Sequence, residues 1–426
     1  MAELGPSPLS AGESQLSVAD ARAAIHSAIK PITQSESVPL AQALGRVLAR
    51  DVVSPIDVPA HDNSAMDGFA FDGALLAAGT GCVLDVIATV YAGAPFDGAL
   101  SGMQCVRIMT GAVMPTGADT VVPQELCRVD AARVHVDAGV IKPGENRRRR
   151  GEDLTQGKPA STAGRVLRPA DMGLIASLGI AEVAVMRRLR VALFSTGNEL
   201  RNLGQSLDPG CIYDSNRFSL IGALQRLGVE VIDLGLVRDD PAALQATLQA
   251  AVAQADVVLT SGGVSVGDAD HTRDVLARMG QVAFWKVAMR PGRPFAFGPL
   301  VHGEEHAEKR AWLFALPGNP VAALVTFYAF AREALMVLAG ARPEPLPVLQ
   351  ARCAVAIRKR PGRTEFQRGI VSRAADGQWQ VQLTGSQGAG VLRSLSEANA
   401  LIVLGHDQGS VAQGEPVDVW LFDGLV

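Results

Sequence analysis

The alternation of strand-like and helix-like segments between residues 190 and 338 constrains the fold more than any other feature of the sequence. RVALFST, VEVIDLG, ADVVLT and AWLFAL are each typical of a buried strand. Apolar residues at helical spacing lie between and after them, over residues 215–227, 241–255 and 320–338. Strands that alternate with helices form βαβ units, so residues 186–341 are predicted to be a three-layer, mostly parallel α/β domain.

The sequence on either side of this region has a different pattern. Short β-branched runs separated by Gly, Pro and Asp predict a β-rich domain, and helical patterns stand before it (17–30 and 40–50) and after it (170–178). The β-rich segment is therefore predicted to be inserted into a helical region. The predicted division is an N-terminal helical and linker region (1–57), a β-rich inserted domain (58–154), the return of the linker region (155–185), the α/β domain (186–341) and, after a Pro-rich linker, a C-terminal β-barrel-like domain (342–426).

Composition narrows the class of protein. The formal net charge of −4 gives no overall attraction to nucleic acid or to a membrane surface. The five cysteines are scattered without a CxxC pair, which indicates reduced thiols rather than a disulfide framework or a zinc site. The N-terminus carries acids and lacks the apolar core of a signal peptide, and no apolar stretch reaches membrane-spanning length. A cytoplasmic protein that binds neither nucleic acid nor membrane is predicted.

Three turns rich in Gly, Ser, Thr or Asn follow predicted parallel strands, at residues 195–199, 261–270 and 316–320. The carboxyl ends of such strands meet at one edge of the sheet, where ligands bind, and the backbone N–H groups of such turns suit phosphate oxygens. Any one turn is better explained as an ordinary strand-to-helix connection. Three at one edge favour a binding site. None matches GxGxxG or the P-loop pattern, which disfavours a dinucleotide or P-loop site.

Acidic residues accompany these turns: Glu199, Asp239, Asp240, Asp268 and Asp270. Carboxylates beside phosphates commonly hold Mg²⁺. For Asp240 the N-cap of the following helix is the preferred interpretation. For Glu199 and Asp270 a functional role is preferred, because an unneutralised carboxylate would repel an anionic ligand.

A basic segment, FWKVAMRPGRPFAFG, lies between the second and third turns. It places Lys286, Arg290 and Arg293 among prolines and glycines, and strongly apolar residues stand on both sides. A solvated basic loop is the simpler explanation. The apolar flanks favour a rigid loop that receives an oxyanion.

The β-rich segment carries polar motifs of its own, DNSAMDGFA, RIMTG and the run Arg147–Arg150 followed by GED. Asp67 and Asp153 could be turn residues, and an arginine run is usually a solvated surface. Small polar residues near Asp67 could equally form the floor of a pocket. From the residues alone, the chain is predicted to bind a phosphorylated or nucleotide-like anion beside Mg²⁺-type carboxylates and a basic oxyanion loop.

Many of these motifs occur together in one known family. The ordered set consists of DNSAMDGFA, RIMTGAVMP, GEDL, FSTGNEL, SNRFSLIGALQRLG, DDP, ADVVLTSGGVSVGDADH, FWKVAMRPGRPFAFG, LPGNPVAALVTF, GRTEFQRG and GSQGAGVLRSLSEANAL. From about residue 17 to the end, the chain resembles the molybdopterin molybdenumtransferases, the bacterial counterparts of the gephyrin E domain.

The resemblance implies an elongated homodimer with four domains per chain. It implies that adenylyl-molybdopterin and molybdate react with Mg²⁺ to give molybdenum cofactor and AMP, in a site shared between the α/β domain of one chain and the β insertion of its partner. The adenylyltransferase that makes the pterin nucleotide and the molybdoenzymes that accept the product are implied as further partners.

The resemblance also assigns roles to residues. Glu199 and Asp270 would serve as metal and catalytic carboxylates, and Asp67, Thr110 and Asp153 would complete the site from across the dimer. Those that would hold the pterin and its phosphates are Ser195, Thr196, Gly197, Asp239, Ser261, Gly262, Gly263, Ser265, Gly267, Pro317, Gly318 and Asn319. Those that would receive molybdate are Lys286, Arg290, Arg293, Pro294, Arg363 and Ser394.

The sequence departs from the family pattern at the basic loop and beside the third turn. Relatives often carry Lys where this chain has Arg290 and Arg293, and a planar guanidinium binds an oxyanion differently from an ammonium group. Some relatives carry Ser where this chain has Ala322, so one hydrogen bond to molybdate would be missing here.

Two other functions were weighed. The adenylyltransferase has a similar α/β domain but usually lacks the β insertion and the last β domain, both of which are present here. A scaffold that binds receptor peptides, as the gephyrin E domain does, would not need the acidic and basic groups described above. Both alternatives are disfavoured relative to molybdenum insertion.

Overall fold

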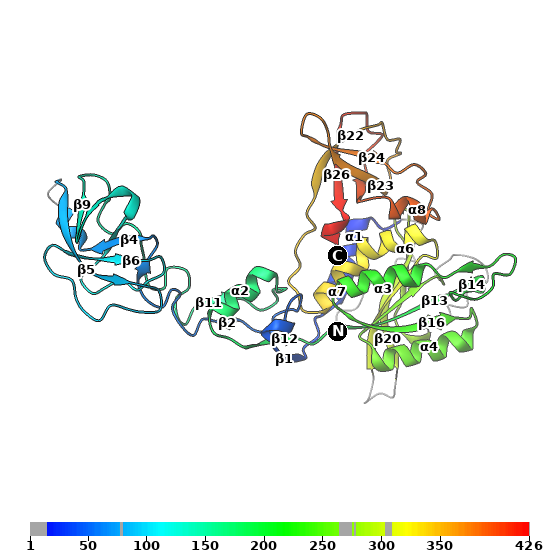
Figure 1. The fold of residues 1–426 in the computed structure, drawn as a ribbon. Coiled ribbons are helices and arrows are strands. Elements are labelled where there is room, and N and C mark those ends of the chain that lie inside the picture. The colour runs from blue at the N-terminus through cyan, green and yellow to red at the C-terminus, as the bar shows by residue number, and fades with distance from the viewer. Residues whose placement is uncertain (1–14, 77–79, 264–274, 277, 303–308, 426) are drawn as a thin grey trace.

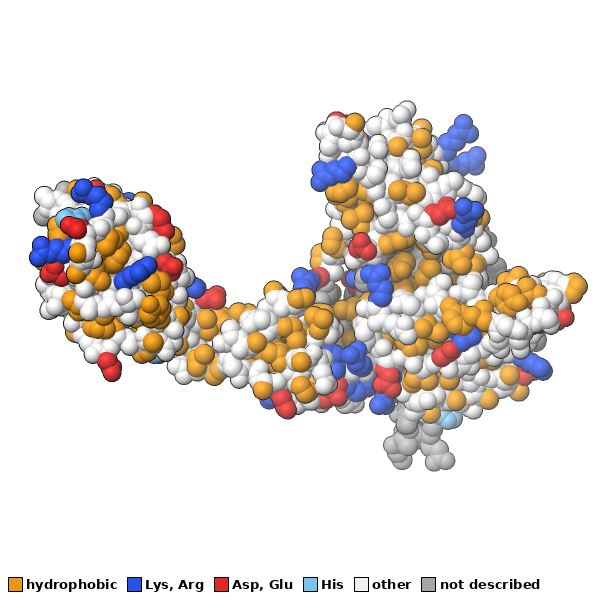
Figure 2. Space-filling model, in the orientation of Figure 1, with side chains coloured by type: hydrophobic (Ala, Val, Ile, Leu, Met, Phe, Trp, Pro, Cys, Tyr) orange, Lys and Arg blue, Asp and Glu red, His pale blue; other side chains and the backbone are white. Residues whose placement is uncertain are grey.

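The computed structural model describes residues 15–76, 80–263, 275–276, 278–302 and 309–425. The molecule is elongated, and a β-rich domain stands apart from the remainder of the chain (Figure 1). A narrow linker region joins that domain to the α/β domain, and the C-terminal β domain packs beside the α/β domain (Figure 2).

A six-stranded sheet forms the centre of the α/β domain. Its order is β16 (Glu230–Val237), β13 (Arg190–Thr196), β17 (Val257–Ser261), β21 (Lys309–Leu316), β20 (Pro294–His302) and β18 (Ala283–Lys286). The first four strands are parallel, and the last two are antiparallel to their neighbours. The predicted α/β domain is confirmed, and the sheet is mixed because the chain returns twice at one edge.

Helices cover both faces of this sheet, which explains why its central strands are apolar throughout. Val191 and Leu193 of β13 pack with α3 (Asn216–Arg226) and α6 (Pro320–Thr326) on one face. Ala192 and Phe194 pack with α4 (Pro241–Gln254) on the other. Successive side chains of a strand point to opposite faces, so a strand between two helical layers must be apolar at every position.

The long C-terminal helix of this domain belongs to its core. It runs through α6, the π-helical turn η5 (Phe327–Ala331) and α7 (Arg332–Leu338), and matches the predicted helix over 320–338. Among the described residues it is the one helix long and apolar enough to cross a membrane, but most of it is buried inside the protein.

The N-terminal segment confirms one predicted helix and contradicts another. Helix α1 (Val18–Ala28) begins where the Ser17 hydroxyl accepts from the Asp20 N–H. Residues 40–50 are not an α-helix, since only a 3₁₀ turn forms at Leu40–Gln42. Gly45 adopts a left-handed backbone (φ +72°), and Val47 and Leu48 then make isolated β-bridges. A left-handed residue stops a right-handed helix, and the β-bridges bind this segment to distant strands.

The linker region is built from paired short elements. Strand β1 (Ser35–Pro39) pairs with β12 (Glu182–Met186), and β2 (Val52–Val53) pairs with β11 (Pro159–Ser161). Helix α2 (Pro169–Ser177) lies where the pattern predicted it. The two halves of the region, before and after the β-rich insertion, therefore fold together.

Two all-β units complete the chain. The β-rich insertion contains a six-stranded sheet in the order β7 (Thr120–Pro123), β4 (Gly68–Phe71), β6 (Gln104–Ile108), β5 (Cys82–Val90), β9 (Arg133–Val136) and β8 (Arg128–Asp130). In the C-terminal domain β23 (Thr364–Arg373), β24 (Trp379–Leu383), β22 (Leu349–Cys353), β26 (Pro416–Leu421) and β25 (Ala400–Leu404) close on themselves through a β23–β25 pairing. This closure makes the predicted β-barrel.

One additional strand links the barrel to the α/β domain. Strand β19 (Met289–Arg290) belongs to the basic segment and pairs with β23 of the barrel. The ends of the basic segment also pair within the central sheet, Lys286 of β18 with Pro294 of β20, so the segment is held by both domains.

Candidate functional site

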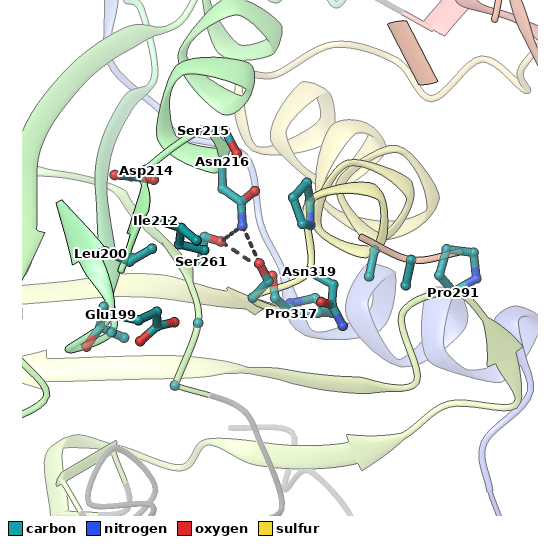
Figure 3. A pocket seen from close by; sticks show the side chains of 18 of the residues that line it. Glu199, Leu200, Ile212, Asp214, Ser215, Asn216, Ser261, Pro291, Pro317 and Asn319 are labelled. Atoms are coloured by element: carbon teal, nitrogen blue, oxygen red, sulfur yellow. Dashed lines mark hydrogen bonds between the residues drawn. The ribbon is translucent and has the colours of Figure 1, made fainter. Parts of the chain in front are cut away.

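A cavity of about 750 Å³ opens at the carboxyl edge of the central sheet (Figure 3). Its volume lies within the range of about 300–1,000 Å³ typical of small-molecule sites. We call it the turn cavity, because the three predicted turns form much of its wall. Its lining residues include Thr196, Gly197, Glu199, Asp214, Asn216, Asp239, Ser261, Gly262, Gly263, Arg290, Pro294, Pro317, Gly318, Asn319 and Gln387.

The first two turns approach each other closely. Gly262 has a φ of +92°, and a Cβ built on it would overlap the carbonyl oxygen of Thr196. Only glycine permits both the left-handed backbone and this approach. The turns that follow β13 and β17 are thus held close together.

The two serines of these turns are directed into the protein. Ser195 is fully buried, and its hydroxyl donates to Asp214 Oδ1 over 3.1 Å. The Ser261 oxygen accepts from Asn216 Nδ2 over 2.7 Å. Thr196 differs, because its hydroxyl is buried in the cavity wall and has no partner among the described residues. Of the three hydroxyls, that of Thr196 is the one without a partner in the described part of the chain.

Two carboxylates stand exposed at the cavity, those of Glu199 and Asp239. Within the described ranges no ion pair or side-chain hydrogen bond engages either one. Asp240 instead caps α4, where its carboxylate accepts from the Ala243 N–H over 2.9 Å, as expected for an N-cap. Asp270, Ser265 and Gly267 lie outside the described residues. In the described part of the chain, no group of three or more metal-ligating side chains occurs.

A second, cationic cavity of about 860 Å³ adjoins the first. It lies between the basic segment and the barrel, and we call it the basic cavity. Among the described residues, its charged lining consists of Arg290, Arg293, Arg358, Lys359, Arg360, Arg363 and one acid, Glu365. Arg290 lines both cavities, so a ligand in either one lies beside the same guanidinium group.

The predicted oxyanion residues are therefore only partly brought together. Arg290, Arg293 and Arg363 line the basic cavity, and Pro294 lines the turn cavity. Lys286 is exposed on β18 and lines neither of these cavities. Because Lys286 and Arg290 fall on different strands, their proximity in sequence does not place them in one cavity.

Arg368 is a buried cation that the sequence-based prediction missed. It is 1 % exposed and donates to Ser394 Oγ and to the carbonyl oxygens of Ser386 and Gly388. Burial lowers the pKa of Arg368 to about 10, and the nearby charge of Arg290 acts in the same direction. None of its three hydrogen-bond acceptors is a carboxylate, which favours an anionic ligand nearby. Ser394, expected to contact molybdate, is buried, and its hydroxyl oxygen accepts from this guanidinium.

Other missed residues lie in the turn that leads into α3 and in a loop of the barrel. Asp214, Ser215 and Asn216 line the turn cavity from one side, and Gln387 and Ala389 line it from another. A signal existed for the first group, since an Asp-Ser-Asn run before a helix is a polar turn close to the sheet edge. Gln387 and Ala389 lie in the family motif GSQGAGVLRSLSEANAL, but their place at this cavity depends on how the barrel packs on the α/β domain.

The predicted residues of the β-rich domain lie far from both cavities of the same chain (Figure 1). Asp67 Oδ1 accepts from the N–H and the hydroxyl of Thr110, each over 2.7 Å, and these bonds hold the pKa of Asp67 below its usual range. Asp153 is exposed on the same domain. The nearby arginine run is largely paired, with Arg147, Arg148 and Arg150 forming ion pairs to Asp62, Glu152 and Asp57.

Comparison with known proteins agrees with this arrangement. Residues 16–179 match the family model "MoeA N-terminal region (domain I and II)", residues 192–337 match "Probable molybdopterin binding domain", and residues 350–422 match "MoeA C-terminal region (domain IV)". A molybdopterin molybdenumtransferase from Haemophilus influenzae is 42% identical over 92% of this chain and 95% of its own length. One from Nostoc is 37% identical over 90% and 88%.

The fold has solved counterparts as well. A molybdopterin biosynthesis moeA protein from Pyrococcus horikoshii superposes with a TM-score of 0.80 at 27% identity, covering 96% of this chain and all of that one. A second structure of that kind from the same organism gives 0.73 at 30% identity, with 96% and 99% covered. Both span all the domains described above.

Proposed function

The chain belongs to the molybdopterin molybdenumtransferase (MoeA) family, and we propose that it inserts molybdate into adenylyl-molybdopterin and releases AMP. One observation carries the details of this proposal: Arg290 lines both cavities, one walled by glycine-rich turns and the other by cations. Two anionic substrates held on either side of one guanidinium group would lie next to each other without direct charge repulsion.

The turn cavity suits the pterin nucleotide. The ends of three strands line it with the backbone of glycine-rich turns, whose N–H groups would face the phosphates. Such groups bind phosphate oxygens without adding a fixed charge. The basic cavity suits molybdate, because Arg293, Arg363 and the buried Arg368 nearby would offset the charge of a dianion.

Mg²⁺ is the cofactor that this reaction would use, and the residues present fit it. Glu199 and Asp239 offer hard oxygen donors at one cavity without competing partners in the described part of the chain. Mg²⁺ is typically held by one or two carboxylates together with substrate phosphates and water, and when bound it would neutralise charge on the departing AMP. Glu199 and Asp239 would hold the ion, and Arg290 would orient the two substrates.

A homodimer would explain how residues far from the cavities of their own chain can belong to the site. Asp67, Thr110 and Asp153 lie on a domain that stands away from the turn cavity of its own chain. Because Asp67 is held ionised by Thr110, it would bring a carboxylate to whichever cavity it reaches. We place this domain of a second copy over the cavity of the first, with the linker region as the connecting arm.

The proposed reaction is tested by incubating the purified chain with adenylyl-molybdopterin and measuring AMP. We expect AMP to appear only when both molybdate and Mg²⁺ are present. With ATP and free molybdopterin we expect no ATP consumption, which separates the enzyme from an adenylyltransferase. AMP release that does not depend on molybdate, or consumption of ATP, would contradict the proposal.

Arg293 allows the role of the basic cavity to be tested separately, because it lines this cavity and not the turn cavity. In Arg293→Ala the molybdate concentration for half-maximal rate should rise at least about tenfold, whereas AMP affinity should change less than about twofold. Arg393→Ala is the matched control, since Arg393 is exposed and lines neither cavity. Equal losses for both ligands would show that the basic cavity is not the oxyanion site.

A further inference from the structure

Asn216, the first residue of α3, joins two of the three turns through one side-chain amide. Its Nδ2 donates to Ser261 Oγ and to the carbonyl oxygen of Gly318, each over 2.7 Å (Figure 3). The Ser261 hydroxyl in turn donates to the Pro317 carbonyl oxygen over 3.4 Å. The end of β17 and the turn after β21 are therefore connected by side-chain bonds.

The remaining turn, at 195–199, is connected through Asp214, two residues before Asn216. Asp214 is 1 % exposed and accepts from Ser195 Oγ at the end of β13. It also accepts from Arg217 Nε over 3.0 Å, and Arg217 forms a second ion pair with Asp233. A charged pair buried in this way holds the segment firmly, because separating it would leave a buried charge without a partner. The backbone that carries Asn216 is therefore held in place by this buried ion pair.

The amide hydrogens of Asn216 are fully used within the protein. A side-chain amide has two N–H donors, and here one serves Ser261 and the other Gly318. Its Oδ1 is buried and has no partner among the described residues. The orientation of the amide is therefore set by the two hydrogen bonds of Nδ2. With both donors engaged within the protein and Oδ1 closed to solvent, Asn216 acts on binding through the positions of the turns that it connects.

We propose that Asn216 is a positioning residue that sets the spacing between the turns at 261–263 and 317–320, and thereby the affinity of the turn cavity for a phosphate-bearing ligand. The inference rests on the proposed function for the identity of that ligand. Binding depends on the spacing because N–H groups from two separate turns must reach the same anion, and small displacements weaken such bonds steeply.

The test compares Asn216→Ala and Asn216→Asp with the wild type, using AMP as the probe in isothermal titration calorimetry. Asn216→Ala should bind AMP at least about tenfold more weakly, with its fold retained. Asn399→Ala is the matched control. The side-chain amide of Asn399 likewise makes two hydrogen bonds, both to the backbone of Val371. Asn399 lies in the barrel and lines none of the cavities described above. Its AMP affinity should stay within about twofold of the wild type.

Asn216→Asp adds a readout that loss of packing would not produce. Its carboxylate has no N–H to donate and would face the Gly318 oxygen, so AMP affinity at pH 7.5 should fall at least as far as in Asn216→Ala. At pH 5 a protonated carboxyl could donate to that oxygen again, and affinity relative to wild type at the same pH should partly recover. The wild-type comparison corrects for titration of the AMP phosphate, whose pKa is about 6.

Amide hydrogen exchange over residues 316–321 measures the connection without any ligand. Exchange should be faster in Asn216→Ala than in Asn399→Ala. Unchanged exchange together with unchanged AMP affinity would overturn the inference while leaving the proposed function standing. A wild-type protein that does not bind AMP would count against the proposed function, and the exchange measurement would then still decide whether Asn216 holds the turns together.

Discussion

Glu199→Gln should lower molybdate-dependent AMP release about a thousandfold, equivalent to roughly 4 kcal/mol in the activation free energy, with the fold intact. Glu199 is exposed at the turn cavity, and no side-chain partner engages its carboxylate in the described chain, so glutamine disturbs no internal contact. What is lost is the negative charge. Without it, a divalent cation would not be held beside the phosphoanhydride that must break.

Chromatography measures the AMP that is released, and thermal unfolding shows whether the variant is folded. Glu230→Gln is a suitable control, because Glu230 is an exposed acid at the start of β16, at the opposite end of the sheet, and is paired with Arg190. Its turnover and melting temperature should match the wild type. Near-normal turnover in Glu199→Gln would refute the proposed role of this carboxylate.

The same variant can test whether the site is shared between two copies. Glu199→Gln and Asp67→Ala chains should each be inactive alone. After dissociation and mixing, half of the dimers would contain both chains, and each of these would have one intact site, so about a quarter of wild-type activity should return. No recovery on mixing would contradict a site built from the β-rich domain of one copy and the α/β domain of another.

Gly262→Ala should weaken AMP binding more than about a hundredfold, the second of the two largest effects expected. The φ of +92° disfavours any side chain, and the added Cβ would meet the Thr196 carbonyl oxygen, so the first two turns must move apart. Since both turns supply the cavity wall, their separation would remove N–H groups from the positions that a phosphate needs.

AMP titration and thermal unfolding test this prediction. Gly222→Ala provides the matched control, because Gly222 lies within α3 and a Cβ there would meet nothing within 4 Å. That change should leave AMP affinity unaltered and raise the free energy of unfolding by about 0.5–1 kcal/mol. Wild-type AMP affinity in Gly262→Ala would show that the close approach of the two turns has no part in binding.

The arrangement of the α/β domain could be read from the sequence because its signals are local. Continuous apolar runs, helical spacing over 215–227 and 241–255, and the cap at Asp240 each arise within a few residues. The rule that ligands bind where parallel strands end then placed Thr196, Gly262 and Gly318 at one cavity. Residues 40–50 show the limit of local signals, since pairing with distant strands prevailed there over a weak helical pattern.

The sequence by itself thus determined the class of fold and the position of the three turns, since backbone periodicity and turn chemistry are properties of short segments. Only the tertiary structure decided which charged side chains meet. Pairing of β19 with β23 puts Arg290 between two cavities, whereas Lys286 on β18 stays outside them, and packing of the barrel loop buries Arg368. These placements depend on contacts between residues tens of positions apart, which no local pattern encodes.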